Sequence, residues 1–437
     1  MTDMYELTML RAALADGSAH RRCGFEAFAR RLPYGRRYGI VAGTGRLLDA
    51  ITEFRFGDAE LEPLRGFLDA ATLDWLAEFR FRGDIDGYRE GDLYFPGSPV
   101  LSVRGTFAEC VVLETLVLSV LNHDTAIASA AARMSYAAGS RTLIEMGSRR
   151  THEEAAVAAA RAAYIAGFAA TSNLEAVRRH GIPGAGTSAH SFTLLHTTAD
   201  GPDEAAAFRS QLDSLGIGTT LLVDTYDITE GVRTAVEVAG TGLGAVRIDS
   251  GDLGEMARQV RAQLDGLGAT RTEIVVSGDL DEYGIAALRA EPVAAYGVGT
   301  SLVTGSGSPP AGLVYKLVEV EGIPVAKRST DKASRGGIKR ALRTVRPTGT
   351  IVEELVYPAA SVDSGAADSG PGRTDLAAPG LHTEELMHPL VRGGDTVPGV
   401  PGVDGARALA ADRLTSVPWE GLRLTRGLPA VPTRFVS

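Results

Sequence analysis

The chain has 437 residues, 44% of them apolar and 22% charged, so it is long enough to bury a large core and to form two or three domains. Its 44 basic and 54 acidic residues give a net charge of −10, which excludes the broad basic surface that nucleic acids and anionic membranes require. The two cysteines, Cys23 and Cys110, provide neither a disulfide framework nor a zinc site, and this favours a reducing cytoplasm.

The first predicted domain covers residues 1–120 and mixes strands with helices, including strand-like runs at 24–28 and 38–41. The N-terminus lacks the basic start and small-residue cleavage site of a secretion signal. The longest apolar run, residues 110–121, is too short to cross a bilayer and contains Glu114. We therefore expect a soluble, unprocessed protein.

The second predicted domain, residues 121–312, alternates short apolar runs with alanine-rich stretches, which is typical of a parallel α/β sheet. Four strands are expected, at residues 219–223, 244–248, 272–276 and 293–296. Polar or glycine residues follow each one. In βα barrels and open α/β sheets alike, functional groups gather at the carboxyl ends of the strands.

Two helices of this domain have recognisable starts. The pair Thr151 and Glu154 fits a capping box before an alanine-rich helix over 153–170. The pair Ser172 and Glu175 fits another before residues 174–180.

The third predicted segment, residues 313–437, begins with a hairpin that turns at Glu321-Gly322 and carries Lys316 on its first strand and Lys327 on its second. The basic stretch at 332–343 either reaches phosphates or forms a solvated helix face. Residues 359–380 are rich in Ser, Gly, Asp and Pro, which predicts a flexible loop or linker.

Three features of the central domain are suited to binding anions. The Gly-Ser-Arg-Arg motif at 147–150 precedes a predicted helix, and Arg149 supplies a forked donor. The Gly-Val-Gly-Thr motif at 297–300 and the Ser277-Gly278-Asp279 motif each close a strand. Each also has a structural interpretation, as a helix start, tight turn or strand end. Together they favour a phosphorylated sugar.

The motif Arg247-Ile-Asp-Ser-Gly-Asp252 places Arg247 and Asp249 on the same side of a strand end, either as site residues or as a structural ion pair. Asp224 and Asp227 flank the preceding strand end and suit Mg²⁺. His190 follows the glycine-rich segment 186–189 and is interpreted as a general base, a nucleophile for phosphoryl transfer or a hydrogen-bonded structural residue.

The motifs in chain order resemble those of nicotinate phosphoribosyltransferases, which join nicotinic acid to phosphoribosyl pyrophosphate (PRPP). The resemblance includes Thr-Asp-Met-Tyr at 2–5, the motifs at 147–150, 186–190, 224–227, 247–252 and 297–300, and the hairpin with Lys316 and Lys327. It implies an irregular, TIM-like βα barrel with a second α/β domain built from both chain ends, and a cytoplasmic homodimer with shared active sites.

The resemblance also implies roles for individual residues. Tyr5 would stack on the pyridine ring from the partner subunit, while Arg247 and Thr187 would hold the nicotinate carboxylate. His190 would be phosphorylated by ATP, and His190, Asp249 and Arg247 form the expected catalytic set. The residues expected to bind sugar phosphate and pyrophosphate are Arg149, Asp249, Gly278, Gly299 and Thr300. Mg²⁺ is the expected cofactor, with Asp224, Asp249 and Asp279 as candidate ligands.

Three alternatives remain open from the sequence. A nicotinamide phosphoribosyltransferase would share the barrel and the histidine, because an uncharged amide also binds near an arginine. A quinolinate phosphoribosyltransferase would need a denser basic pocket for two carboxylates. A non-catalytic barrel that senses phosphate is the alternative from outside the enzymes.

Overall fold

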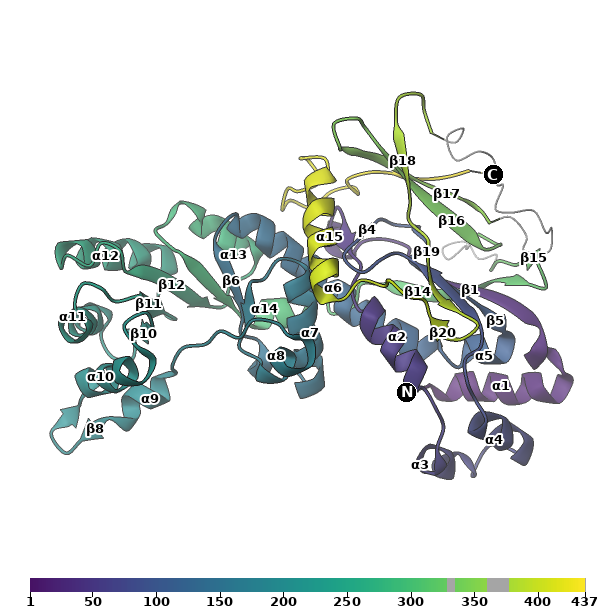
Figure 1. The fold of residues 1–437 in the computed structure, drawn as a ribbon, viewed down its shortest axis with the longest axis horizontal. Coiled ribbons are helices and arrows are strands. Elements are labelled where there is room, and N and C mark those ends of the chain that lie inside the picture. The colour runs from purple at the N-terminus through teal and green to yellow at the C-terminus, as the bar shows by residue number, and fades with distance from the viewer. Residues whose placement is uncertain (328–334, 360–376, 437) are drawn as a thin grey trace. The chain divides into compact units, whose positions relative to one another are not determined.

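The computed structural model describes residues 1–327, 335–359 and 377–436. The chain forms two compact units, one made of Met1–Ser129 with Ser308–Ser437 and the other of Ala130–Gly307 (Figure 1). The unit boundaries lie at 129/130 and 307/308, whereas the sequence predicted changes at 120/121 and 312/313. One long helix, α6 (Glu114–Ala138), carries the chain from the first unit into the second.

The second unit contains a six-stranded parallel sheet with the order β10-β11-β12-β13-β6-β7. Its strands are, in chain order, β6 (Thr142–Glu145), β7 (Ala170–Thr171), β10 (Thr220–Leu222), β11 (Ala245–Ile248), β12 (Glu273–Gly278) and β13 (Ala295–Val298). All four strands predicted from the apolar runs are present. The expected α/β fold is confirmed.

Helices follow these strands as in repeated βα units. They are α7 (Glu153–Ile165), α8 (Leu174–His180), α9 (His190–Leu195), α10 (Glu204–Leu215), α11 (Ile228–Ala239), α12 (Leu253–Gly266), α13 (Glu282–Ala287) and α14 (Thr300–Val303). A short hairpin of β8 (Thr197–Thr198) and β9 (Gly201–Pro202) lies between α9 and α10.

Several acidic residues near the strand ends are helix caps. The carboxylate of Asp227 accepts from the Glu230 amide, that of Asp252 from the amides of Gly254 and Glu255, and that of Asp281 from two amides of α13. Such caps satisfy amide groups that the helix leaves unpaired. Helix capping therefore accounts for Asp227, which the sequence had grouped with Asp224 as suited to Mg²⁺.

The predicted capping boxes are wrong, although the helices exist. The N-cap of α7 is His152, not Thr151, and that of α8 is Asn173, whose side chain accepts from the Ala176 amide. In both cases the helix starts one residue later than the box requires. The first helix is also shorter than predicted, because it ends at Ile165 and the chain enters β7 at Ala170.

The first unit is built around a seven-stranded antiparallel sheet with the order β15-β14-β1-β5-β3-β19-β20. The strands are β1 (Arg22–Ala29), β3 (Asp84–Gly87), β5 (Leu101–Thr106), β14 (Leu313–Val320), β15 (Ile323–Pro324), β19 (His388–Arg392) and β20 (Asp395–Thr396). Three strands from the N-terminal part, β1, β5 and β3, lie side by side between two pairs of strands from the C-terminal part, so neither end completes the sheet alone.

A second sheet in this unit has the order β18-β16-β17-β21, formed by β16 (Lys339–Val345), β17 (Ile351–Pro358), β18 (His382–Glu385) and β21 (Thr433–Phe435). The short strands β2 (Gly39–Ile40) and β4 (Leu93–Tyr94) pair with each other. The remaining helices are α1 (Met4–Asp16), α2 (Thr44–Glu53), α3 (Asp58–Leu61), α4 (Ala70–Ala77), α5 (Phe107–Val111) and α15 (Val403–Ser416).

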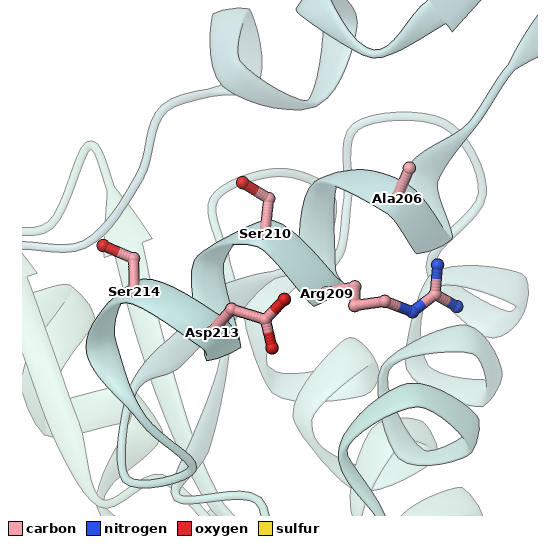
Figure 2. A pocket seen from close by; sticks show the side chains of 5 residues that line it. All are labelled: Ala206, Arg209, Ser210, Asp213 and Ser214. Atoms are coloured by element: carbon pink, nitrogen blue, oxygen red, sulfur yellow. The ribbon is translucent and has the colours of Figure 1, made fainter.

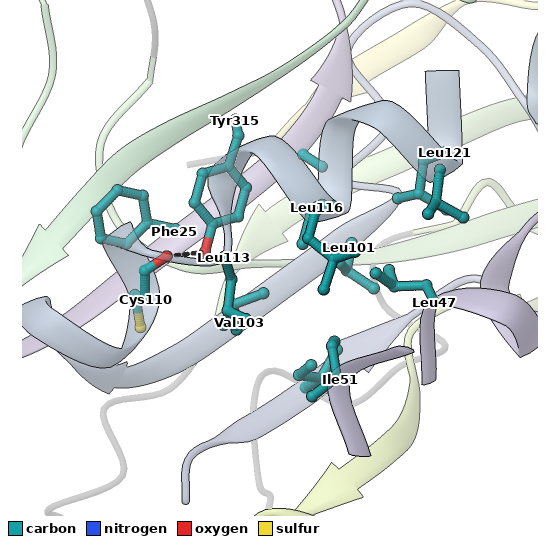
Figure 3. Packing of buried hydrophobic residues seen from close by; sticks show 14 of the residues in the cluster. Phe25, Leu47, Ile51, Leu101, Val103, Cys110, Leu113, Leu116, Leu121 and Tyr315 are labelled. Carbon is teal, nitrogen blue, oxygen red and sulfur yellow. Dashed lines mark hydrogen bonds between the residues drawn. The ribbon is translucent and has the colours of Figure 1, made fainter. Parts of the chain in front are cut away.

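The core of the first unit joins β1, β5 and β14 to α2, α5 and α6 (Figure 3). The rings of Phe25 and Tyr315 stack with centroids 4.9 Å apart, and the Tyr315 hydroxyl donates to the Cys110 carbonyl at 3.1 Å. Residues Phe107–Ala138 are long and apolar enough to cross a membrane, but 67% of the most apolar window is buried inside the protein. Such burial is typical of the core helix of a soluble protein.

The C-terminal predictions are partly wrong. The hairpin turns at Glu321-Gly322 as expected, with φ of 50° and 73°, but Lys327 lies beyond β15 and not on a strand. The basic stretch at 332–343 is no helix face where it is described, because it enters strand β16. Lys339 and Arg343 are buried there and pair with Glu26 and with Asp92 and Glu354. Residues 332–334 of the basic stretch lie outside the described residues. So do residues 360–376, which make up most of the predicted linker.

Candidate active site

The loops that follow the parallel strands are tied to one another by carboxylates. Asp224, after β10, accepts through Oδ2 from the Asp249 amide at 2.8 Å and from the Ser250 hydroxyl at 2.7 Å, both after β11. Asp249 in turn accepts through Oδ1 from the Ser277 hydroxyl of β12 at 2.5 Å. The carboxyl ends of three adjacent strands are therefore fixed by two carboxylates, which holds this edge rigid.

A similar carboxylate links the other side of the sheet. Glu145, the last residue of β6, is buried and accepts from the Thr171 hydroxyl of β7 at 2.5 Å and from the Gly147 amide. Burial raises the pKa of Glu145 despite these two hydrogen bonds. The bond to Gly147 fixes the start of the Gly-Ser-Arg-Arg turn.

Arg247 lies on β11 with its guanidinium half-buried. Its Nη1 donates to the Thr187 hydroxyl and, at 3.2 Å, to the Ser188 carbonyl. The pKa of Arg247 is lowered on balance. Burial lowers it most, the charges of Asp249 and Asp224 raise it, and the charge of Arg149 lowers it further. Its Nε is buried and has no hydrogen-bond partner. The side chain thus keeps an unused donor next to Thr187, in a setting where burial makes an anionic partner favourable.

His190 is the first residue of α9, and it lies close to the same carboxylate edge. Its Nδ1 is 3.1 Å from the Thr225 hydroxyl, and its Nε2 is 3.9 Å from Asp224 Oδ1. The Asp224 side chain is only 1% exposed, and this Oδ1 has no hydrogen-bond partner. Arg247 contacts Thr187, and the charge of Asp224 acts on Arg247 while its Oδ1 lies near His190, so the structure brings these three predicted residues to the same strand ends.

Two glycine turns pack directly against each other beside β13 and β6. A Cβ on Gly147 would lie 2.2 Å from Cγ1 of Val303 and 3.2 Å from the Gly299 carbonyl oxygen. A Cβ on Gly297 would lie 2.6 Å from the Met146 sulfur. These positions require glycine because no side chain fits between the turns. This packing fixes the two turns relative to each other.

The other predicted anion-binding residues surround these turns. Arg149 and Thr300 are exposed, and Gly278 has φ of 133°, a conformation that other residues rarely adopt. Tyr5 belongs to the first unit, where it lies on α1 with 43% exposure. Burial, followed by the charges of Glu114 and Glu6, raises the pKa of Tyr5 to about 12, so its hydroxyl stays neutral.

The three candidate metal ligands do not gather into one cluster. Across the residues that the structure describes, there is no group of three His, Cys, Asp or Glu side chains placed to hold a metal ion. Asp279 is exposed, whereas Asp249 and Asp224 each use one oxygen to bond a neighbouring loop. The unpartnered Asp224 Oδ1 remains suited to a cation, which it would hold together with substrate oxygens.

Sequence reasoning missed Glu204, the first residue of α10. Its Oε1 is buried without a hydrogen-bond partner, and burial, followed by the charges of Asp224 and Asp227, raises its pKa to about 7. Glu145 was missed in the same way, whereas Ser277 had been named as part of the Ser277-Gly278-Asp279 motif. The available signal for Glu145 was its position two residues before the predicted glycine turn at 147–150.

An open hollow of about 540 Å³ lies elsewhere, along one face of α10. It is lined by Ala206, Arg209, Ser210, Asp213 and Ser214, all from this one helix (Figure 2). None of the predicted site residues lines it.

Comparisons with known proteins agree with the motifs. Residues 1–122 match the nicotinate phosphoribosyltransferase N-terminal domain, and residues 142–350 match the nicotinate phosphoribosyltransferase family. The chain is 65% identical to nicotinate phosphoribosyltransferase pncB1 of Mycobacterium tuberculosis, over 100% of this chain and 95% of that protein. The chain belongs to the nicotinate phosphoribosyltransferase family.

More distant members of the family match over nearly the whole chain. The human nicotinate phosphoribosyltransferase is 29% identical over 97% of this chain and 92% of its own length. The crystal structure of human nicotinic acid phosphoribosyltransferase superposes with a TM-score of 0.80 at 26% identity, covering 100% of this chain and 97% of that one. A Pyrococcus furiosus nicotinate-nucleotide pyrophosphorylase at 24% identity, with a TM-score of 0.76 and 95% coverage of both chains, shares the fold.

Proposed function

We propose that this enzyme joins nicotinate to PRPP, releasing nicotinate mononucleotide and pyrophosphate, as a step of NAD salvage in the cytoplasm. The family membership supports this activity, and one observation within the site carries it. Arg247 is half-buried, is oriented by Thr187, and keeps a buried Nε without a partner. A guanidinium with an unused donor is suited to the planar carboxylate of nicotinate.

The proposed reaction needs positioning and fixed charge more than acid–base chemistry. Nicotinate attacks the anomeric carbon through its ring nitrogen, the bond to pyrophosphate breaks, and positive charge builds on the ribose during the exchange. Asp249, which accepts a hydrogen bond from Ser277, is the carboxylate proposed to face the ribose. Gly278, Gly299, Thr300 and Arg149 are the proposed donors to the phosphate groups. No strong base is needed.

Mg²⁺ is the proposed cofactor, and it would neutralise charge on the departing pyrophosphate. Asp224 offers the one buried carboxylate oxygen of the candidate ligands that lacks a partner, so it is the proposed protein ligand, with Asp249 next to it. We also propose that two copies of the chain share active sites, with Tyr5 of each stacking on the nicotinate bound by the other.

The six-stranded sheet is proposed to be part of an irregular βα barrel. Beyond β7, the bridge between Thr171 and Gly184 continues the parallel pairing in the direction that closure would require. Strand ends arranged around a barrel mouth would bring the glycine turns and Arg247 to face the same substrate.

ATP is the proposed co-substrate, and His190 is the proposed phosphoryl acceptor. With its proton on Nδ1 and donated to Thr225, the neutral imidazole presents the lone pair of Nε2. Nε2 would attack the γ-phosphorus of ATP, forming the P–N bond as the bond to ADP breaks. The added negative charge would order basic loops around PRPP.

The decisive experiment incubates the purified protein with nicotinate, PRPP, Mg²⁺ and ATP. We expect nicotinate mononucleotide and pyrophosphate in equal amounts. Competition between labelled nicotinate and nicotinamide distinguishes the acid from the amide. Binding of PRPP without release of pyrophosphate would instead support a sensing protein.

The role of His190 is tested by His190→Ala. We expect this variant to lose the stimulation by ATP and to keep slow synthesis without ATP, because the imidazole accepts phosphate but does not attack the ribose. The rates of synthesis by the wild type and by His190→Ala, each with and without ATP, measure this. Equal loss of both activities would contradict the role.

A further inference from the structure

Glu282 is a buried charged residue to which the proposed reaction gives no role. It is the first residue of α13, and it follows the Ser277-Gly278-Asp279 motif, in which β12 ends. Its side chain is 4% exposed, and its Oε1 pairs with Nε of Arg133 at 2.9 Å, itself 5% exposed. Arg133 also donates to the Tyr283 hydroxyl at 3.3 Å. This carboxylate is therefore held in one orientation.

The other oxygen of Glu282 accepts a hydrogen bond from the hydroxyl of Ser306. Ser306 lies after β13 and α14, so the bond joins the loops that follow two adjacent strands. The carboxylates of Asp224 and Asp249 make equivalent links between the strands before them. Burial raises the pKa of Glu282, but the bonds from Ser306 and Arg133 outweigh it, and the net pKa is lowered. The bond is accordingly assisted by charge.

The backbone at Ser306 also requires an external support. Ser306 has φ of 53°, between Gly305 at 61° and Gly307 at 80°, so three successive residues adopt the left-handed conformation. A non-glycine residue is unfavourable there unless its surroundings hold it. The hydrogen bond to Glu282 provides that support.

Ser306 is connected through α14 to the glycine turns of the candidate site. Its amide donates to the Ser301 carbonyl at 2.6 Å, and the Thr304 amide donates to the Thr300 carbonyl at 3.1 Å. Val303, between them, fills the space that a Cβ on Gly147 would need. A shift of the turn at 305–307 would therefore move both the 297–300 loop and the packing of the 147–150 turn.

We infer that Glu282 is a positioning residue of the phosphate-binding loops, which it holds through Ser306 at the spacing that the diphosphate of PRPP requires. The inference rests on the proposed function for the identity of the substrate. Glu282 itself contacts no substrate.

Two substitutions at Ser306 separate the hydrogen bond from the backbone strain. Ser306→Ala loses the bond and keeps the unfavourable φ, whereas Ser306→Gly loses the bond and relaxes the backbone. We expect both to raise KM for PRPP about tenfold, the effect of one charge-assisted hydrogen bond, and to leave KM for nicotinate unchanged. Ser306→Asn, which tolerates this φ and carries a donor, should recover part of the loss. An exposed control is Ser210→Ala on α10.

Calorimetric binding of pyrophosphate in the presence of Mg²⁺ gives a readout independent of turnover. Weaker binding by both Ser306→Ala and Ser306→Gly supports the inference, even if the wild-type protein makes no nicotinate mononucleotide. In that case only the proposed function would be wrong. The inference is overturned if Ser306→Gly binds pyrophosphate and PRPP like the wild type, if KM for both substrates rises equally, or if the wild type does not bind pyrophosphate. Glu282→Gln combined with Ser306→Ala should be no worse than Glu282→Gln alone, because both remove the same hydrogen bond.

Discussion

At the scale of single residues, Arg247 offers the sharpest test of substrate choice. Arg247→Lys keeps the positive charge but removes the planar guanidinium and its hydrogen bond to the Thr187 hydroxyl. We expect KM for nicotinate to rise roughly 10- to 100-fold, while weak use of nicotinamide changes much less. Steady-state kinetics with both substrates measure this. An equal loss for acid and amide would show that Arg247 does not bind the carboxylate.

Glu204 gives the protein a pH dependence whose sign follows from its raised pKa. The unfolded chain ionises this group near pH 4.5, whereas the folded protein keeps the proton up to about pH 7, because burial and the charges of Asp224 and Asp227 disfavour ionisation. Folding thus binds a proton in this window, and stability falls as the pH rises through it. Glu204→Gln removes this loss, so the variant should gain in melting temperature over the wild type between about pH 5 and about pH 8.

Glu255→Gln is the matched control, since Glu255 also lies in the first turn of its helix. Its hydrogen bond from Arg258, followed by one from Gln259, lowers its pKa. The stabilising contribution of Glu255 is present above its unfolded pKa and lost in acid, which is the opposite sign. A Glu204→Gln variant whose melting temperature relative to wild type does not change with pH would show that this carboxyl ionises normally.

The residues that carry obvious chemistry were accessible from the sequence, and those that support them were not. Arg247 belongs to a motif at a predicted strand end, Thr187 and His190 belong to the glycine-rich motif at 186–190, and the structure brings them together. Glu204 and Glu282 have no motif. Both owe their properties to burial and to partners distant in sequence, such as Asp224 and Arg133, which spacing along a chain does not reveal.

At the scale of elements, the contact between the two glycine turns predicts a steric effect. Gly147→Ala would place a methyl group 2.2 Å from Val303 Cγ1, so the turns must separate. We expect a loss of about 1 to 3 kcal/mol in stability and a rise in KM for PRPP. In Gly186→Ala the added methyl group meets nothing within 4 Å, and its stability should change by less than about 0.5 kcal/mol. Thermal melts and kinetics of both variants test this, and equal behaviour would contradict the packing.

Strands were predicted better than the starts of helices. The runs that became β10 to β13 are short, apolar and buried, so composition alone marks them. At each helix start two neighbouring polar residues were both able to cap the helix, so the sequence did not distinguish them. The actual caps, His152 and Asn173, lie one position after the predicted Thr151 and Ser172. Asn173 also donates to the Ser148 hydroxyl, a tertiary contact that local pattern does not contain.

At the scale of the whole molecule, the first unit depends on a buried ionic network. Arg343 is fully buried and pairs with Asp92 at 2.6 Å and with Glu354 at 2.7 Å, which joins β16 to β17 and to the segment before β4. Arg343→Met would leave two buried carboxylates without this partner, and we expect a loss of about 3 to 5 kcal/mol in the free energy of unfolding.

The matched control is Arg434→Met, because Arg434 pairs with Glu353 at the surface with its side chain 49% exposed. We expect this change to cost less than about 1 kcal/mol. Urea titrations of both variants measure the difference. Similar losses would mean that the buried network contributes no more than a surface ion pair.

The sequence predicted a domain built from both chain ends only through the resemblance to a family. Local patterns mark the strands β1 and β14, but nothing in the chain between them indicates that Cys23 is opposite Val320. Pairing these strands costs conformational entropy, because a long loop must close. Burial of the core shown in Figure 3 offsets this loss, and that core depends on all of the strands together.

The placement of early strands between late ones has a consequence for the nascent polypeptide. The unit made of Ala130–Gly307 is complete as soon as its last residue leaves the ribosome, whereas β1 must wait for Leu313–Val320 to be translated. At bacterial or eukaryotic elongation rates this delay is on the order of tens of seconds. During this delay the edge of β1 that pairs with β14 has no partner strand, so the nascent first unit exposes a free strand edge on which other chains could pair.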